Sequence, residues 1–200
     1  DAQESRGLGD VYKRQPQVYA DHVQRVAFIG GESSGKTTLA RVLAERLQTV
    51  WVPEYGRTLW EQRGGELTPG DLLRIAMTQP QHEDEAVRRA HRWLFCDTTP
   101  LVTLGYSGWM FGTAPQPLRQ AARRRYDLLF LCAPDIPFDQ DGTRVGEAFR
   151  AQQHAWYLEQ LQAEGVEHVL LEGDLETRIA RVQGELAKRA DNRFSVAQPL

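Results

Sequence analysis

The stretch from residue 30 to residue 37 has the residue types and spacing of a phosphate-binding loop. It consists of Gly-Gly-Glu-Ser-Ser-Gly-Lys-Thr and fits the pattern G-x-x-x-x-G-K-[ST]. Backbone N–H groups must come close to phosphate oxygens in such a loop, and Gly30 and Gly35 leave them room. Lys36 carries a mobile charge that can reach the β- and γ-phosphates, and the Thr37 hydroxyl can bind Mg²⁺. The pattern therefore predicts a site for a nucleoside triphosphate with Mg²⁺.

The segments on either side of this loop fit the same interpretation. Residues 25–29 are apolar and β-prone, as in a buried strand, and residues 38–47 carry apolar side chains at helical spacing. A helix N-terminus favours phosphate through its free N–H groups and its dipole. The alternative is a glycine-rich turn before an ordinary helix, since the bare pattern arises by chance in about one per cent of such chains. The predicted nucleotide-binding residues are Gly30, Gly31, Glu32, Ser33, Ser34, Gly35, Lys36, Thr37 and Thr38.

Asp97 follows the hydrophobic segment 93–96, the position of the acidic residue that binds Mg²⁺ in many nucleotide-binding proteins. A carboxylate there can hold Mg²⁺, directly or through water, opposite Thr37. The alternative is that Asp97 caps the helix predicted to begin at Pro100, and one residue can do both.

Glu54 ends the apolar segment 49–53 and is the second carboxylate of interest. Facing a bound triphosphate, it could accept a proton from a substrate hydroxyl. Asp97 is the competitor for this role as base. The alternative for Glu54 is a salt bridge to Arg57, three residues further along.

Three arginines are candidates for contacts with the nucleotide. Arg144 and Arg150 lie in and just after residues 133–146, a loop long enough to act as a lid. An arginine brought in by closure could stabilise the charge on a phosphoryl group in transfer, so both are predicted to be catalytic. Arg178 could flank an adenine ring. Solvated surface arginines are the alternative at all three positions.

The alternation of strand-like and helix-like segments predicts an α/β fold with three α/β/α layers, a five-stranded parallel sheet and a lid, as in P-loop NTPases. We expect a kink or break near Gln79, because Pro80 removes a backbone donor inside one helix. The carboxyl ends of parallel strands meet at one edge of a sheet, so one active site is predicted there. The expected strands are 25–29, 49–53, 93–96, 127–132 and 166–171, and the expected helices are 38–47, 58–63, 69–92, 100–111, 114–125, 147–164 and 174–189.

The composition narrows the class of protein. The chain has 200 residues and a net charge of -3, which gives no sign of nucleic-acid binding. Its two cysteines, Cys96 and Cys132, lie in apolar segments and are predicted to be buried thiols. No apolar run approaches transmembrane length and no signal peptide is visible, so we expect a cytoplasmic protein. The sequence indicates no protein partner.

The expected domain covers residues 25–190, between a disordered tail at 1–24 and a frayed tail at 191–200. The segment Asp10-Val11-Tyr12-Lys13-Arg14-Gln15 back-translates into a transposon-end sequencing adaptor. Residues 1 to about 15 are therefore set aside as an expected read artefact. The alternative is a natural polar tail.

Four motifs together resemble the ribosylnicotinamide kinase domain of NadR-type proteins. They are Gly-Gly-Glu-Ser-Ser-Gly-Lys at 30–36, Glu-Tyr-Gly-Arg at 54–57, Asp-Thr at 97–98 and Asp-Gly-x-Arg at 141–144. The resemblance extends over about residues 25–185. It implies ATP-dependent phosphorylation of the ribose 5′-hydroxyl of nicotinamide riboside, giving nicotinamide mononucleotide. It also implies that Glu54, Tyr55 and Arg57 face the riboside, and that Arg144 and Arg150 belong to the lid.

Nicotinamide riboside carries a positive charge on its pyridinium ring, which an aromatic face can stabilise. Tyr106 and Trp109 are therefore added to the predicted substrate-binding residues, with a role in the core as the alternative for Trp109. Two other functions stay open. One is a kinase or NTPase for another nucleoside or nucleotide, and the other is a nucleotide-dependent switch. A hydroxyl-activating Glu54 favours a kinase, because a switch needs no such base.

Overall fold

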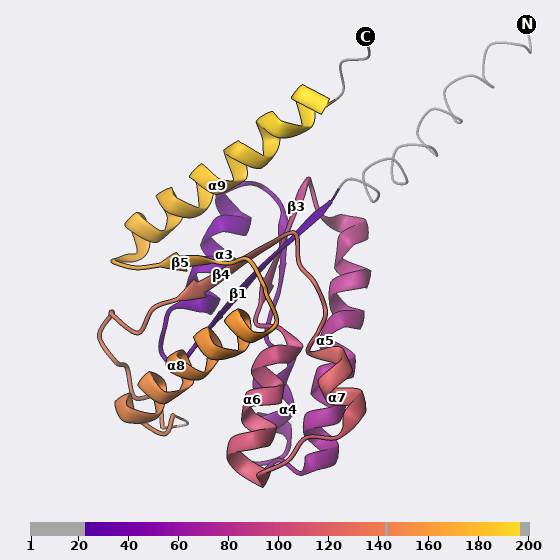
Figure 1. Ribbon diagram of the computed structural model, residues 1–200, viewed down its shortest axis with the longest axis vertical. Coiled ribbons are helices and arrows are strands. Elements are labelled where there is room, and N and C mark those ends of the chain that lie inside the picture. Colours follow the sequence, from indigo (N-terminus) through magenta and orange to yellow (C-terminus); the bar gives the residue numbers. More distant parts are fainter. Residues whose placement is uncertain (1–22, 143, 197–200) are drawn as a thin grey trace, which may run out of the picture.

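Five parallel strands form the centre of the molecule, in the order β2-β3-β1-β4-β5 (Figure 1). The computed structural model describes residues 23–142 and 144–196. All four strand pairs are parallel, so the predicted fold class is confirmed. The strands are β1 Gln24–Gly30, β2 Val50–Val52, β3 Trp93–Asp97, β4 Leu128–Cys132 and β5 Val169–Leu171.

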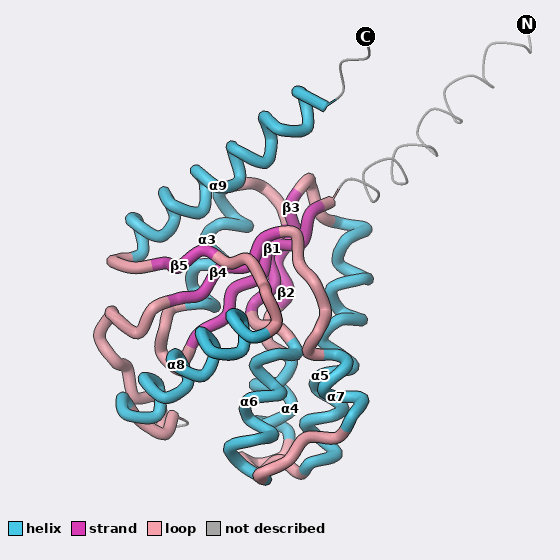
Figure 2. Tube along the Cα trace, in the orientation of Figure 1, coloured by secondary structure: helices cyan, strands magenta, loops and turns pink. Residues whose placement is uncertain are grey.

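Helices follow the strands and cover both faces of the sheet (Figure 2). The side chains of β1 alternate between these faces, because successive residues of a strand point in opposite directions. Each face therefore builds its own buried core. The helices are α3 Lys36–Arg46, α4 Tyr55–Gln62, α5 Pro69–Ala86, the short 3₁₀ helix η1 Val87–Arg89, α6 Pro100–Phe111, α7 Gln116–Ala121, α8 Glu147–Ala163 and α9 Leu175–Val196.

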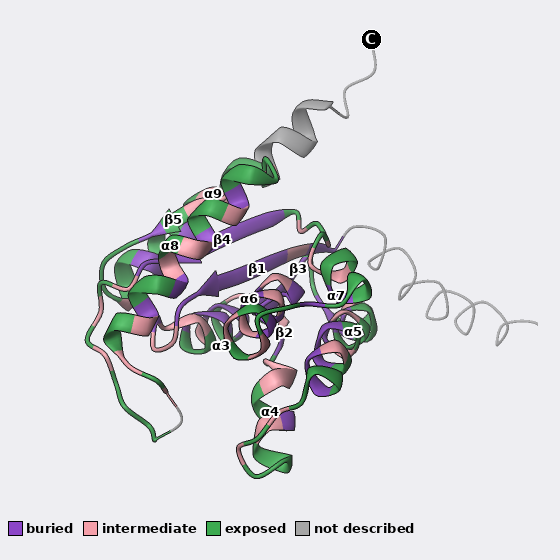
Figure 3. Cartoon of the chain, turned by 60° about the horizontal axis from the view of Figure 1, so that its bottom comes forward, coloured by how far each residue is buried: buried purple, intermediate pink, exposed green. Residues whose placement is uncertain are grey.

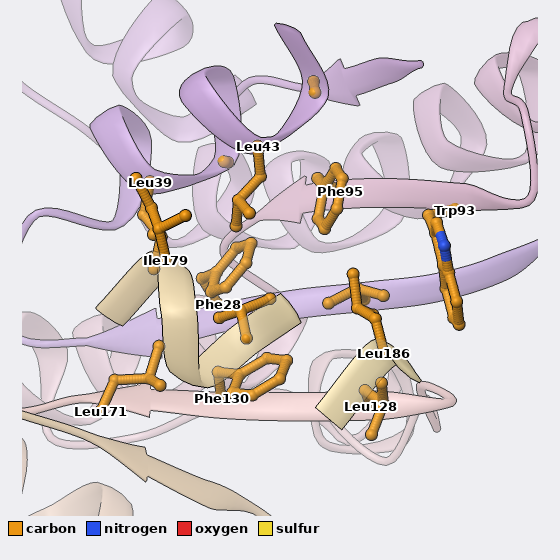
Figure 4. Packing of buried hydrophobic residues seen from close by; sticks show 14 of the residues in the cluster. Phe28, Leu39, Leu43, Trp93, Phe95, Leu128, Phe130, Leu171, Ile179 and Leu186 are labelled. Carbon is orange, nitrogen blue, oxygen red and sulfur yellow. The ribbon is translucent and has the colours of Figure 1, made fainter. Parts of the chain in front are cut away.

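The first core lies between the sheet and helices α3 and α9. Phe28 of β1 is stacked between Phe95 and Phe130 of the neighbouring strands, with ring centroids 6.0 and 5.6 Å away (Figure 4). The same buried cluster contains Leu39 and Leu43 of α3 and Ile179, Val182 and Leu186 of α9. This packing fixes the start of α3 directly after β1, where the phosphate loop must lie.

The second core lies on the opposite face, against α8, α6 and the end of α5. It contains Ala27 and Ile29 of β1 together with Tyr157 and Leu161 of α8. Helices α4 to α7 then form two smaller clusters, one of them around Leu59, Leu72 and Ile75. Burial follows this layering, since the central strands β1, β3 and β4 are buried and the helices are exposed on their outer sides (Figure 3).

Of the predicted kink or break at Pro80, the break is wrong. The helix runs without interruption from Pro69 to Ala86, with Pro80 inside it. Proline removes one backbone donor, but the neighbouring residues Ala76, Gln79 and Glu83 are buried against the rest of the protein. Tertiary packing therefore outweighs the local cost of the proline.

Other elements differ from the prediction at their ends. Helix α4 begins at Tyr55 rather than at residue 58, so the Glu-Tyr-Gly-Arg motif enters a helix. Helix α7 covers only Gln116–Ala121, and the edge strand β5 covers only Val169–Leu171. The last helix, α9, continues to Val196, beyond the end expected near residue 189. The tail predicted at residues 1–24 lies mostly outside the described residues, as do residues 197–200 of the predicted C-terminal tail.

Both cysteines are buried free thiols, as predicted, and burial raises the pKa of Cys132 to about 11. Among the residues that the structure describes, no helix is both long and apolar enough to cross a membrane.

Gly105 and Gly108 of α6 offer a matched test of this packing. A methyl group on Gly105 would come 2.7 Å from the Trp109 ring and 3.0 Å from the Trp156 ring, whereas one on Gly108 meets nothing within 4 Å. Gly105→Ala should therefore lower the free energy of unfolding by about 1–3 kcal/mol through overpacking. Gly108→Ala should raise it by up to about 1 kcal/mol, because alanine is the better helix former. Urea denaturation of both variants checks this, and equal changes would contradict the packing described for α6.

Candidate active site

The phosphate loop connects β1 to α3 and is pressed against its neighbours at two glycines. A Cβ atom on Gly30 would lie 2.7 Å from the carbonyl oxygen of Cys132 on β4. One on Gly31 would lie 2.8 Å from the carbonyl oxygen of Arg150 on α8. Gly35 has a φ of 81°, which favours glycine, and leads into the helix. The loop is thus held from two sides with its backbone at the N-terminus of α3.

Lys36 lies over this loop. Its ammonium group donates hydrogen bonds to the carbonyl oxygens of Gly30 and Gly31, at 3.0 and 2.8 Å. Two backbone carbonyls therefore hold the charge beside the loop, where phosphate oxygens would compete for it. The predicted contact of Lys36 with phosphate stays a prediction.

Asp97 lies beside Thr37, as the prediction of a metal site requires. The Thr37 hydroxyl donates to Asp97 Oδ2 at 2.7 Å, and Asp97 is only 1% exposed. Its other oxygen, Oδ1, is buried without a hydrogen-bond partner among the described residues. Helix α6 is capped by Thr99 and not by Asp97, because the Thr99 side chain accepts from Leu101 N–H.

These observations fit Mg²⁺. An unpaired buried carboxylate oxygen next to a hydroxyl is a suitable set of hard oxygen ligands, and phosphate oxygens commonly complete such a site. The described part of the chain contains no group of three or more His, Cys, Asp or Glu side chains that could hold a metal alone. Thr37 and Asp97 are thus suited to a metal that arrives with a nucleotide.

Glu54 stands at the junction of β2 and α4, at the N-cap position of the helix. Burial raises the pKa of Glu54 to about 7, and the nearby Asp97 carboxylate adds to this rise, while Lys36 and Arg57 oppose it. The alternative salt bridge from Glu54 to Arg57 is not what the structure shows, since Arg57 pairs with Asp141 at 3.3 Å. Glu54 is therefore a carboxylate close to the phosphate site with a proton affinity suited to acid–base chemistry.

Gln79 holds this junction in place and could not be recognised from the sequence. Its side chain accepts from Tyr55 N–H at 2.9 Å and donates to the carbonyl oxygen of Pro53 at 3.3 Å. The Tyr55 ring then meets the ring of His82 edge to face, at 5.3 Å between centroids. The polar side chain next to the proline of α5 thus positions the residues on either side of Glu54.

Tyr106 and Trp109 have different surroundings. The Tyr106 hydroxyl donates to Glu32 Oε1 of the phosphate loop at 3.1 Å, so Tyr106 lies at the site. Trp109 packs edge to face against Tyr106, Phe149 and Trp156 at 5.2 to 5.5 Å. Trp109 thus belongs to an aromatic cluster behind Tyr106, and its direct contact with a substrate stays a prediction.

The loop after β4 contacts the phosphate loop directly. Asp139 N–H donates to Ser33 Oγ at 2.9 Å, and Val145 N–H donates to Glu32 Oε2 at 2.8 Å. Arg144 forms ion pairs with Asp139 and Asp141, both at 3.3 Å. Arg144 therefore lies close to the predicted nucleotide site, but its guanidinium is paired with carboxylates of its own loop.

Arg150 is buried on α8 and is not a solvated surface residue. Its guanidinium donates to the carbonyl oxygens of Ile136 and Ser33 at 2.9 and 3.3 Å, and it lies over the Phe138 ring. These contacts tie the loop after β4 to the phosphate loop. A catalytic contact of Arg150 with phosphate stays a prediction.

Arg178 is also buried, with 2% exposure, so the alternative of a surface arginine is wrong. It donates to the carbonyl oxygens of Ser34, Ala133 and Gly173 at 2.7 to 3.0 Å and forms an ion pair with Asp135. The guanidinium thereby joins the phosphate loop to the loops after β4 and β5. Its predicted place beside adenine stays a prediction.

Comparison with known protein families decides which group this site belongs to. The AAA domain family matches residues 25–178, which include the phosphate loop, Glu54, Asp97 and Arg178. The chain belongs to the AAA domain family. The predicted P-loop resemblance is confirmed by this match.

Within this family, the chain is similar in sequence and in structure to NadR proteins. The chain is 33% identical over 168 residues to the trifunctional NAD biosynthesis/regulator protein NadR of Escherichia coli K12, covering 80% of this chain and 41% of that protein. A crystal structure of NadR in complex with NR matches with a TM-score of 0.67 at 25% identity, covering 80% of this chain and 48% of that chain. The chain thus spans less than half of the NadR proteins, and the predicted resemblance to NadR is confirmed.

Thymidylate kinase from Ehrlichia chaffeensis has the same fold, with a TM-score of 0.59 at 18% identity, covering 82% of this AAA domain and 98% of that chain. This similarity shows that the two proteins share a fold.

Lys36 offers a direct test of the phosphate site. Lys36→Ala should reduce phosphoryl transfer by about two orders of magnitude or more, because its charge is needed most in the transition state. Lys188, an exposed lysine of α9 that pairs with Glu185, supplies the matched control. Lys188→Ala should leave turnover of ATP unchanged. Near-normal turnover by Lys36→Ala would remove the phosphate-loop assignment.

The raised pKa of Glu54 predicts a pH dependence. A base acts in its ionised form, so kcat/KM for the nucleoside should rise with increasing pH and level off above about 7. Glu54→Gln should lower kcat/KM by about 10²–10⁴-fold and remove this acidic limb. Steady-state rates of both proteins across the pH range check this. Persistence of the same limb in Glu54→Gln would transfer the role of base to Asp97.

Proposed function

We propose that this protein is an ATP-dependent kinase that phosphorylates the ribose 5′-hydroxyl of nicotinamide riboside. The observation that carries the proposal is the position of Glu54. Its carboxylate stands close enough to Asp97 and Lys36 for their charges to alter its pKa, at the end of the sheet where the phosphate loop lies. A phosphate site alone fits many nucleotide-binding proteins, whereas an adjacent base fits transfer to a hydroxyl group.

Binding of the phosphate donor uses the loop at the start of α3. The backbone N–H groups of the loop and the Lys36 ammonium would hold the β- and γ-phosphates of ATP. Thr37 and Asp97 would hold Mg²⁺, which when bound neutralises part of the phosphate charge. The family match and the fold support nucleotide binding in this position.

Glu54 suits the role of base better than Asp97 does. One oxygen of Asp97 accepts the Thr37 hydroxyl, and its other oxygen is the buried atom suited to the metal. The structure describes no hydrogen bond to the Glu54 carboxylate. The pKa of Glu54, about 7, lets it take a proton near neutral pH. It would therefore accept the proton of the ribose hydroxyl as the oxygen attacks the γ-phosphate.

We propose that Arg144 approaches the transferring phosphate when its carboxylate partners release it, and that Arg150 holds the loop for that approach.

The charge of the site favours a cationic nucleoside. Glu32 and Glu54 place two carboxylates near the Tyr106 ring, and Tyr55 and Arg57 begin the helix that follows Glu54. A pyridinium ring is stabilised by carboxylates and by aromatic faces, with about 0.5–2 kcal/mol from a cation over a ring. The matched NadR structure is described as a complex with NR, which agrees with this choice.

A kinase for another nucleoside or nucleotide is the second candidate. It is favoured by one observation, that this chain matches 98% of the length of a thymidylate kinase. A neutral base would gain nothing from the carboxylates beside Tyr106. The electrostatics of the site therefore separate the two candidates.

Substrate preference tests the proposal. With Mg-ATP, kcat/KM for nicotinamide riboside should exceed that for uridine by an order of magnitude or more, because only the former carries a positive base. A coupled assay for ADP formation with each nucleoside measures the ratio, and Lys36→Ala provides the background rate. Equal rates on both nucleosides, or ATP hydrolysis that ignores the nucleoside, would refute the riboside assignment and leave the phosphate site intact.

A further inference from the structure

Gln153 of α8 forms a closed set of hydrogen bonds with the phosphate loop and α6. Its Oε1 accepts from Glu32 N–H at 2.8 Å, and its Nε2 donates to the Tyr106 hydroxyl at 3.1 Å. The Tyr106 hydroxyl in turn donates to Glu32 Oε1 at 3.1 Å. Gln153 is 1% exposed, whereas Glu32 and Tyr106 are half-buried. We call this set the Gln153 relay.

The direction of each bond in the Gln153 relay follows from chemistry. Glu32 N–H can only donate, so the oxygen of the Gln153 amide must face it. The amide nitrogen must then face Tyr106, whose hydroxyl accepts from it and has one proton left to give. That proton goes to the Glu32 carboxylate, which can only accept. Burial raises the pKa of Tyr106 well above its usual range, which keeps this proton in place.

Both oxygens of the Glu32 carboxylate accept a hydrogen bond. While Oε1 accepts from Tyr106, Oε2 accepts from Val145 N–H of the loop after β4 at 2.8 Å. Helix α8 has no space to move closer to the loop at this point, because even a Cβ atom on Gly31 would lie only 3.1 Å from Gln153 Oε1. A carboxylate on the phosphate loop is thereby held beside Tyr106.

We propose that Gln153 is a positioning residue that sets the preference of the enzyme for cationic over neutral nucleosides, by holding Glu32 through Tyr106. This inference rests on the proposed function and adds to it the residue that determines specificity. Gln153 itself does not touch the substrate. Its effect is to keep the Glu32 charge at one place, where it adds to the charge of Glu54.

The physical basis is that a fixed charge discriminates better than a mobile one. Interactions between charges weaken with distance and with access of water, so a carboxylate released into solvent attracts a cation less strongly. The binding of a neutral nucleoside depends little on where this carboxylate lies, because the nucleoside carries no net charge. Loss of the relay should therefore affect the two kinds of nucleoside unequally, whereas a purely structural defect would affect them alike.

Two variants and a control test the relay. Gln153→Leu removes both amide bonds, and Tyr106→Phe removes only the hydroxyl while keeping the ring. Each should lower kcat/KM for nicotinamide riboside by on the order of tenfold and change kcat/KM for uridine much less. Gln152→Leu alters the neighbouring exposed residue of α8 and should leave the ratio of the two unchanged.

The double variant separates a relay from two independent effects. If Gln153 acts through Tyr106, Gln153→Leu combined with Tyr106→Phe should lose little more of the substrate preference than either change alone. Full additivity of the two losses would overturn the proposal, as would an equal loss for both nucleosides in Gln153→Leu. In those cases wild-type protein would still prefer nicotinamide riboside, and the proposed function would stand.

A measurement without substrate covers the case in which the wild type shows no preference. Hydrogen exchange of the Glu32 amide, followed by NMR in the full chain, should be faster in Gln153→Leu than in wild type and Gln152→Leu. Unchanged exchange would contradict the relay itself. A relay confirmed by exchange in a protein without preference would overturn both the proposed function and the role of Gln153 in specificity.

Discussion

Close contact of backbone with backbone at the end of β1 is the constraint on which the rest of the site depends. Gly30 approaches the carbonyl group of Cys132, and Gly31 approaches that of Arg150. No side chain fits in either place, so the phosphate loop is clamped between β4 and α8. Arg178 adds a third restraint by donating to the Ser34 carbonyl oxygen. The N–H groups of the loop can therefore be arranged for phosphate before any ligand binds, which reduces the cost of ordering on binding.

Three carboxylates, those of Glu32, Glu54 and Asp97, lie near the phosphate loop, and they differ in the hydrogen bonds that they accept. Asp97 accepts a hydrogen bond from Thr37, and Glu32 accepts two, from Tyr106 and Val145. Glu54 accepts no hydrogen bond from the described residues, and burial raises its pKa to about 7, while burial also raises the pKa of Asp97. A carboxylate left with a raised pKa near reacting groups is suited to moving a proton. The division of roles among the three carboxylates thus follows from their hydrogen bonds.

Much of this arrangement could be predicted from the sequence, because local patterns carry it. The phosphate loop follows from its glycines and lysine, and the place of Asp97 follows from the apolar strand before it. The continuity of α5 through Pro80 could not be predicted, since it depends on packing around Gln79. Gln153 has no motif and lies about 120 residues from its partner Glu32. A polar residue that acts through long-range hydrogen bonds leaves no periodic signal in the sequence.

The most direct test of the account is the fate of the γ-phosphate of ATP. Purified protein with Mg-ATP and nicotinamide riboside can be followed by ³¹P NMR and by mass spectrometry of the nucleoside. The account predicts that ADP appears together with an equal amount of nicotinamide riboside phosphorylated at the 5′-hydroxyl. Release of inorganic phosphate with ADP, without any phosphorylated nucleoside, would contradict it, because Glu54 would then not direct transfer to a hydroxyl group.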